Sequence, residues 1–594
     1  MQLSTLDWSF IAAFFVLSLA IGLVVSKRAG KSASEYFLSG RSMPWWLLGF
    51  SMVATTFSAD TPNLVTDIVR KNGVSGNWQW WAFLLTGMLT VFVYAKLWRR
   101  SGVLTDLEFY ELRYSGKPAA FLRGFRALYL GVFFNVMIMA TVSLAAIKIG
   151  GVLLGLSPVQ TILIASIVTV VYTSLGGLTG VIWTDFFQFI VAMIGVVGAA
   201  VVVVNLPEIG GLSNLLQHPN VSPKLSVLPD FNDMSALLPF LILPLAVQWW
   251  SVWYPGAEPG GGGYIAQRML SAKTETHAIT ATLFFNFVHY ALRPWPWILV
   301  ALASLIIYPD IASLRTAFPD LPENVINDDL AYPAMMTFLP SGLLGLVVAA
   351  LIAAYMSTIA THLNWGASYV VNDFYKRFIR PDADEKTLVN IGRLSTVILM
   401  VFSALIALAL SNALQAFNIL LQIGAGTGLI FILRWFWWRI NAWSEMSAMI
   451  ISFLVACYFE FFATGLETHV KLIAGVAITS AGWIAVTFLT QPTSQATLLR
   501  FYRLIKPHPA GWQPVIQKGI QAGDIHAGEV IAGKLPLEIV CMVAGCFLVY
   551  GALFGLGFFL YGETTKAFVG FALATLAGFI LIRAWNQVKG NSAA

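Results

Sequence analysis

Long apolar segments recur along the whole chain and constrain its fold more than any other feature. A helix that crosses a bilayer needs about 20 mostly apolar residues, and fifteen segments meet that requirement. They lie near 6–26, 44–70, 77–98, 120–155, 158–178, 182–206, 235–270, 277–308, 333–375, 388–411, 413–438, 445–464, 468–489, 537–560 and 565–587. Hydrocarbon offers backbone groups no hydrogen-bond partner, so such segments must be helical. The sequence predicts an all-α integral membrane protein with about 15 transmembrane helices.

Charge is scarce and spread out. Charged residues make up 11% of the chain, with 35 Lys+Arg and 29 Asp+Glu, against about 25% in soluble domains. The net charge of +6 is distributed over loops that flank the apolar segments, which does not give the basic face that nucleic-acid binding needs. The three cysteines lie in apolar segments, which excludes a secreted disulfide scaffold. The expected surroundings are the lipid bilayer, with no nucleic acid and no obligatory protein partner.

The basic residues also predict an orientation. Lys27 and Arg28 follow the first apolar segment and do not precede it, which argues against a cleaved signal peptide. We expect a retained helix with the N-terminus outside. Most of the Lys and Arg residues, Arg268 among them, then fall on the cytoplasmic side, as the positive-inside rule requires. The prediction is a multi-pass plasma-membrane protein, of the bacterial inner membrane, with a cytoplasmic C-terminus.

The second apolar segment, 44–70, carries a polar interruption that ends in Pro62. The proline ring collides with the carbonyl of Ser58 and offers no N–H, so the helix should open just before it. Open backbone at membrane depth is tolerated where it lines a cavity or is buried in protein. The plainer alternative is a proline kink whose free carbonyls are satisfied by neighbouring hydroxyl groups.

A stronger interruption follows five segments later. Within 255–263, seven of the nine residues are Gly or Pro, so no continuous helix passes through 235–270. Two broken helices at matching places are typical of an inverted-repeat transporter with its site near the bilayer midplane. An odd number of helices per unit makes the second unit inverted. The alternative is two short re-entrant pieces without a function.

These breaks predict a 5+5 inverted repeat inside a larger chain. The predicted units are a peripheral helix and loop (1–43), the first repeat (44–206), an extracellular loop (207–234), the second repeat (235–440), two peripheral helices (441–489), a cytoplasmic connector (490–536) and two C-terminal helices (537–594).

The ninth segment offers oxygen ligands on one helical face. Ala354, Ser357 and Thr358 stand at i, i+3 and i+4, which brings one carbonyl and two hydroxyl groups together. The carbonyls of Ala54 and Phe57 at the first break would bring the total to five uncharged oxygens. Such a set suits Na⁺, whereas Ca²⁺ needs carboxylates and transition metals need His or Cys. The alternative is that both hydroxyls only pack or bond to their own helix.

Three motifs then resemble the sodium:solute symporter family. They are GGLTGVIWTDFFQ (176–188), AYMSTIATHLN (354–364) with NDFYK (372–376), and PWWLLGFSMVATTFSAD (44–60). The resemblance implies a LeuT-like fold and Na⁺-driven uptake, with Na⁺ at the five residues just named. It also implies that Asp185 lies on the sodium exit path, although Asp185 can equally be a helix-end carboxylate.

The resemblance covers the substrate contacts less fully. In the family's sugar-transporting branch, positions matching Thr56, Asp60 and Thr61 contact the substrate, and Arg293 falls near that branch's lysine. The branch's N-Q-Y-x-x-Q-R stretch becomes GGGGYIAQR (260–268) here, and the role of its glycine run stays open. Tyr264 is then either an aromatic lid or an interfacial tyrosine. The predicted substrate contacts are Thr56, Asp60, Thr61, Glu258, Tyr264, Arg293 and Gln422.

The leading functional hypothesis is Na⁺-coupled symport, by alternating access, of a polar organic solute into the cell. The solute is a sugar or polyol, an amino acid or a carboxylate, and Na⁺ is the co-transported ion. One alternative is coupling to H⁺ through Asp60, Asp185 or Glu258. A remote alternative is a membrane-embedded transferase, which is disfavoured because the sequence has no cluster of acids, His or metal ligands near a membrane face. We therefore expect no enzyme and no catalytic residues.

Overall fold

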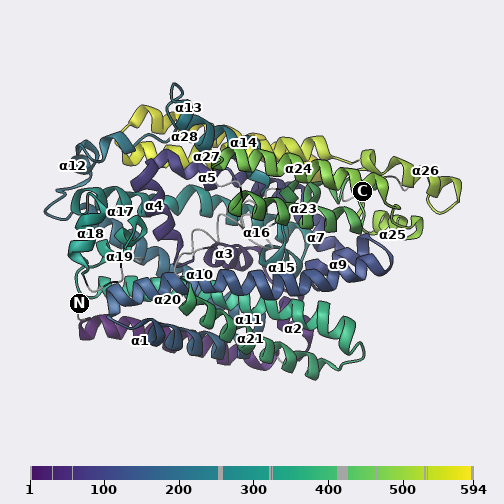
Figure 1. The fold of residues 1–594 in the computed structure, drawn as a ribbon, viewed down its shortest axis with the longest axis horizontal. Coiled ribbons are helices and arrows are strands. Elements are labelled where there is room, and N and C mark those ends of the chain that lie inside the picture. The colour runs from purple at the N-terminus through teal and green to yellow at the C-terminus, as the bar shows by residue number, and fades with distance from the viewer. Residues whose placement is uncertain are drawn as a thin grey trace.

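The structure is a computed structural model that describes residues 3–29, 31–56, 58–251, 258–319, 321, 323, 326–410, 424, 426–462, 465–526, 530 and 533–589. Its regular elements in these ranges are helices, and one isolated bridge joins Met43 to Ala272. Most of the long helices run along the long axis of the molecule (Figure 1). They are α1 (Thr5–Ala29), α9 (Gly116–Leu128), α10 (Asn135–Ile149), α11 (Pro158–Val204), α16 (Glu275–Phe287), α17 (Pro294–Ile307), α20 (Leu343–Ser368), α21 (Glu385–Ala409), α23 (Ala442–Phe461), α24 (Thr468–Leu489), α27 (Leu535–Leu560) and α28 (Thr564–Lys589).

Eleven helical segments of the described chain are long and apolar enough to cross a membrane. Each overlaps one of the fifteen predicted segments. Three further predicted segments contain shorter apolar helices: Trp45–Thr55, Pro158–Val171 and Met234–Ala246. The last, 413–438, begins on residues 411–423, which lie outside the described ranges. The four predicted segments that are not among the eleven complete spans are therefore those that are broken, bent or incompletely described.

α11 joins two segments that the sequence separates. Its 47 residues bend at Gly177, which has φ +52° and ψ −158°. Only glycine adopts such a conformation without steric cost. α11 therefore consists of two helices that meet at a kink, and this kink lies next to the boundary predicted between 158–178 and 182–206. Ser157 caps the start of α11 by accepting from the N–H of Gln160, and Pro158 follows at the first position.

The centre of the bundle lies around α3 (Trp45–Thr55) and α20. α20 is buried along almost its whole length and packs against α11, α1, α10, α21 and α3. α3 also contacts α16, α11 and α15 (Gly263–Ser271), and it sits in the middle of the molecule in Figure 1. The first predicted break is therefore surrounded by helices from both predicted repeats.

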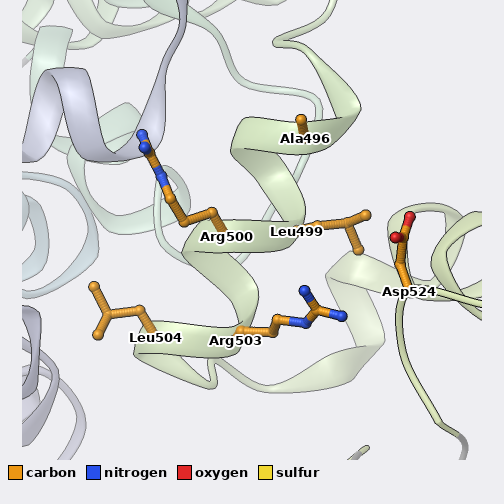
Figure 2. Close-up of a pocket in the computed structure, with 6 residues that line it drawn as sticks. All are labelled: Ala496, Leu499, Arg500, Arg503, Leu504 and Asp524. Carbon is orange, nitrogen blue, oxygen red and sulfur yellow. The ribbon is translucent and has the colours of Figure 1, made fainter.

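The connector predicted at 490–536 forms α25 (Gln495–Ile505) and α26 (Gln513–Gln521), which project from one end of the bundle (Figure 1). A shallow pocket lies on this connector, lined by Ala496, Leu499, Arg500, Arg503, Leu504 and Asp524. Arg503 points toward Asp524, whereas Arg500 points away (Figure 2). The pocket belongs to the connector and not to either broken span.

Candidate functional site

The first broken span brings a helix end into the centre of the bundle. α3 stops at Thr55 and α4 (Thr61–Asn72) begins at Thr61, so the span is interrupted between these two helices. This confirms the opening predicted from Pro62, which occupies the first turn of α4, where its missing N–H costs nothing. The last carbonyls of α3 consequently lack intrahelical donors. Phe57, a predicted carbonyl ligand, lies outside the described residues.

The hydroxyl groups of α20 meet this helix end. Ser357 Oγ donates to Oδ1 of Asp185 at 2.6 Å, and Thr358 Oγ1 donates to the carbonyl of Thr55 at 2.9 Å. Both residues and Ala354 are at most 2% exposed. A hydroxyl that donates its only proton keeps its lone pairs as acceptors. The two oxygens can therefore bind a cation without giving up these hydrogen bonds.

Asp185, on α11, ties the two helices together. Its carboxylate accepts from Ser51 Oγ of α3 at 2.5 Å as well as from Ser357. Arg268 of α15 lies opposite, with Nη2 3.6 Å from Oδ2 of Asp185 and 2.7 Å from the Thr361 hydroxyl to which it donates. Asp185 and Arg268 are both fully buried. The site thus combines neutral oxygens with a carboxylate and a guanidinium group immediately behind them.

Sequence reasoning missed three members of this arrangement. Thr361 follows Ser357 by four residues, so the spacing that identified Ser357 continues one turn further along α20. Ser51 similarly precedes Thr55 by one turn on α3. Arg268 was counted only among the basic residues of the cytoplasmic side, and the structure buries it fully beside Asp185. Its signal was its position within a predicted span, where a charge usually indicates function.

Arg293 and Thr56 lie together at the end of α3. Arg293 falls between η10 (Val288–Leu292) and α17. It donates to the carbonyls of Val53 at 2.8 Å and Thr56 at 2.9 Å, and its guanidinium lies over the Trp297 ring. A cation at the carbonyl end of a helix is favourable because it meets the negative end of the helix dipole. Arg293 therefore holds the end of α3 in place.

The remaining predicted substrate contacts occupy different positions. Asp60 and Thr61 are half-buried at the start of α4. Tyr264 lies on α15, with its ring 6.0 Å from that of His362 and 5.9 Å from the guanidinium of Arg268. Gln422 lies outside the described residues.

Glu258, from the second broken span, lies between two arginines. Its Oε2 accepts from Arg434 at 2.9 Å, and its Oε1 forms an ion pair with Arg126. All three side chains are about 2% exposed. The carboxylate of Glu258 is therefore held by the protein's own cations.

Comparison with known proteins places this geometry in context. The family model of the sodium:solute symporter family matches residues 36–452. A sodium/glucose cotransporter of Vibrio parahaemolyticus is 29% identical over 475 residues, which cover 77% of this chain and 86% of that protein. A sodium/myo-inositol cotransporter of Homo sapiens is 28% identical over 439 residues, which cover 68% of this chain and 58% of that protein.

Among solved structures, a substrate-bound, outward-open Na⁺-coupled sialic acid symporter aligns with a TM-score of 0.68 at 22% identity. The alignment covers 83% of this chain and 99% of that one. At this level of identity the likeness shows a shared helical fold. The family match includes both broken spans and all of α20.

Proposed function

The chain belongs to the sodium:solute symporter family, and from that premise we propose that Na⁺ binds at the end of α3 and drives uptake of a sugar- or polyol-class solute. The protein is a Na⁺-coupled symporter and not an enzyme. The observation that carries the proposed site is the pair of hydrogen bonds by which Ser357 and Thr358 donate their protons away and keep their oxygens available. The proposed ligands are the carbonyls of Ala54, Phe57 and Ala354 and the hydroxyls of Ser357 and Thr358.

The charges behind this site support reversible binding. Asp185 stands one hydrogen bond from Ser357 and adds negative potential, while Arg268 offsets it from 3.6 Å. The ligands themselves are neutral oxygens, and the charge of Asp185 is largely offset by that of Arg268. Na⁺ is therefore bound weakly enough to dissociate. We propose that Na⁺ leaves past Asp185 when the inner side opens.

The solute class rests on the relatives and on polar groups near the breaks. The relatives' names include glucose, mannose and myo-inositol cotransporters. Neutral hydroxyl-rich solutes of this kind suit contacts from mixed polar side chains. The candidate contacts are Thr56, Asp60, Thr61, Tyr264, Arg293 and Gln422. Glu258 receives a separate role below.

The proposed architecture is a LeuT-like 5+5 inverted repeat, with repeats at 44–206 and 235–440 and fifteen membrane crossings. The proposed orientation places the N-terminus outside and the connector and C-terminus in the cytoplasm of a bacterial cell, since most basic residues then face inward. Transport would follow alternating access, with Na⁺ holding α3 against α20 while the outer side is open.

The site is tested in two stages. A thermal-shift screen of purified protein against sugars, polyols, amino acids and carboxylates, in Na⁺ and in K⁺, identifies the solute. Uptake into proteoliposomes is then measured for Ser357→Ala and Thr358→Ala, which we expect to lose Na⁺-stimulated uptake. Ser403→Ala is the matched control, because Ser403 is a buried hydroxyl residue on α21, away from this site.

Unchanged Na⁺ dependence in both variants would refute the proposed site. Uptake driven by a pH gradient in the absence of Na⁺ would favour the alternative, H⁺ coupling through Asp60 or Asp185. Stabilisation by an amino acid or carboxylate, and not by sugars or polyols, would change the solute class while leaving the cation site intact.

A further inference from the structure

Four buried charges meet between α9, α23 and the second broken span. α9, α25 and α7 (Ala95–Ser101) lie toward the same end of the molecule (Figure 1). Arg126 lies on α9 and Glu445 on α23. Arg434 directly follows the helix at 426–433, and Glu258 belongs to the second broken span. Each side chain is at most 2% exposed. These four residues are called the charge cluster below.

Glu258 is the member that joins both arginines directly. Its Oε2 accepts from Arg434 Nη2 at 2.9 Å, and its Oε1 pairs with Arg126. Glu445 Oε2 lies further away, 3.5 Å from Arg434 and 3.9 Å from Arg126. Arg434 also donates to the Tyr110 hydroxyl at 3.0 Å. The cluster has two positive and two negative charges, so it is neutral as a whole.

A neutral buried cluster is sensitive to the loss of one member. Removing one acid leaves an uncompensated positive charge away from water, which is far more costly than replacing a pair. If the elements separate and water enters, each charge becomes hydrated and the cost disappears. The cluster therefore favours a closed arrangement only while both glutamates are present.

The backbone next to Glu258 is also held by the first half of the chain. Gly260 has φ +89°, and its carbonyl accepts from Trp98 Nε1 at 2.8 Å. The N–H of Gly263 donates to Asp106 at 2.9 Å. A Cβ atom on Gly260 would approach the Tyr94 ring to 2.9 Å, so the close contact requires glycine. The turn that restarts the broken span as α15 is thus docked on α7 and its following loop.

We infer that Glu258 is a positioning residue for transport, which clamps the turn of the second broken span to Arg126 and Arg434 and thereby closes the cytoplasmic end of the pathway. The clamp opens when the span moves away from α9 and the charges become hydrated. This inference rests on the proposed alternating-access function and on the proposed orientation. It assigns Glu258 to the inner closure and not to the solute.

The test follows the accessibility of two reporter cysteines in full-length protein whose three native cysteines are replaced by alanine. Ala266→Cys reports on the inner side, because Ala266 is buried on α15 near the turn. Thr66→Cys is the outer reporter, because Thr66 is buried on α4, which follows the first break and leads outward in the proposed orientation. Its hydroxyl lacks a hydrogen bond, so the substitution removes none. Each is labelled with an impermeant maleimide in membrane vesicles of defined sidedness at saturating Na⁺.

Glu258→Gln is expected to speed cytoplasmic labelling of the inner reporter at least tenfold and to slow outside labelling of the outer reporter. General loosening of the fold would speed both. Glu538→Gln is the matched control: it removes a buried acid paired with Lys96 at the same end of the molecule, but on α27. In Glu538→Gln, both reporter cysteines should react at the rates seen in the parent protein.

Parent rates at both reporters in Glu258→Gln, or faster labelling of both, would overturn the inference. Should Glu258→Gln fail to reach the membrane, Glu445→Gln removes the other acid. It must also speed labelling of the inner reporter and slow labelling of the outer reporter. Parent labelling rates in Glu445→Gln would overturn the inference as well. Labelling requires no uptake. A failure of the proposed Na⁺ coupling would therefore appear in the proteoliposome assay alone, and a failure of the clamp in the labelling alone.

Discussion

Asp185 is the formal charge closest to the proposed sodium ligands, and its removal should weaken Na⁺ binding. Asp185→Asn abolishes the negative charge one hydrogen bond behind Ser357. Groups that support metal ligands in this way typically contribute 10–100-fold in affinity. We expect the Na⁺ concentration for half-maximal uptake to rise about tenfold or more. Asp67→Asn is the control, because Asp67 pairs with Lys71 on α4; an equal rise there would contradict the assignment.

Arg268 should have the opposite effect on Na⁺ affinity. Arg268→Gln removes the positive charge 3.6 Å from Asp185, so the negative potential at the site increases. Na⁺ should bind more tightly and leave more slowly, which lowers both the half-saturating Na⁺ concentration and the maximal rate. Na⁺ titrations followed by thermal shift measure the first and uptake measures the second. If Arg268→Gln and Asp185→Asn both weaken Na⁺ binding, the pair serves the fold and not the ion.

At the scale of elements, the end of α3 depends on Arg293. The guanidinium reaches two carbonyls at once, a geometry that the ammonium group of lysine does not reproduce. Each hydrogen bond to a charged group contributes about 1.5–3 kcal/mol. Arg293→Lys should therefore lower the melting temperature in detergent. Lys148→Arg, at a partly exposed pair with Asp329, is the comparison that should leave it unchanged; equal melting of Arg293→Lys and the parent would contradict the capping role.

The breaks were predictable from sequence because their causes are local. Pro62 and the Gly/Pro run at 255–263 disrupt a helix wherever it lies, and the first break forms where expected. The Ser357 and Thr358 face was predictable because helical spacing fixes it. By contrast, the pairing of Glu258 with Arg126 and Arg434 joins residues far apart in the chain, and no periodicity encodes which buried charges meet. The kink of α11 at Gly177 lies next to the boundary predicted between 178 and 182, because its cause, a glycine, is also local.

At the scale of the whole molecule, the number of crossings determines where the two ends of the chain lie. Eleven spans are complete in the described residues, and the other four predicted segments are broken, bent or partly undescribed. An odd total places the ends on opposite sides of the membrane. Fifteen crossings, in which each of these four segments counts once, give such an odd total.

That count can be measured directly. Epitope tags at the two ends, probed in intact cells and in inside-out vesicles, should be accessible from opposite sides, the N-terminal tag from outside and the C-terminal tag from the cytoplasm. A single cysteine on the connector, at Arg503 beside Asp524 (Figure 2), should react from the cytoplasmic side. The connector follows the end of α24 and precedes the start of α27, and the proposed orientation places both of these helix ends in the cytoplasm. Accessibility of both tags from one side would require an even number of crossings. One broken segment would then enter and leave on the same side, and the inverted relation between the two repeats would be lost.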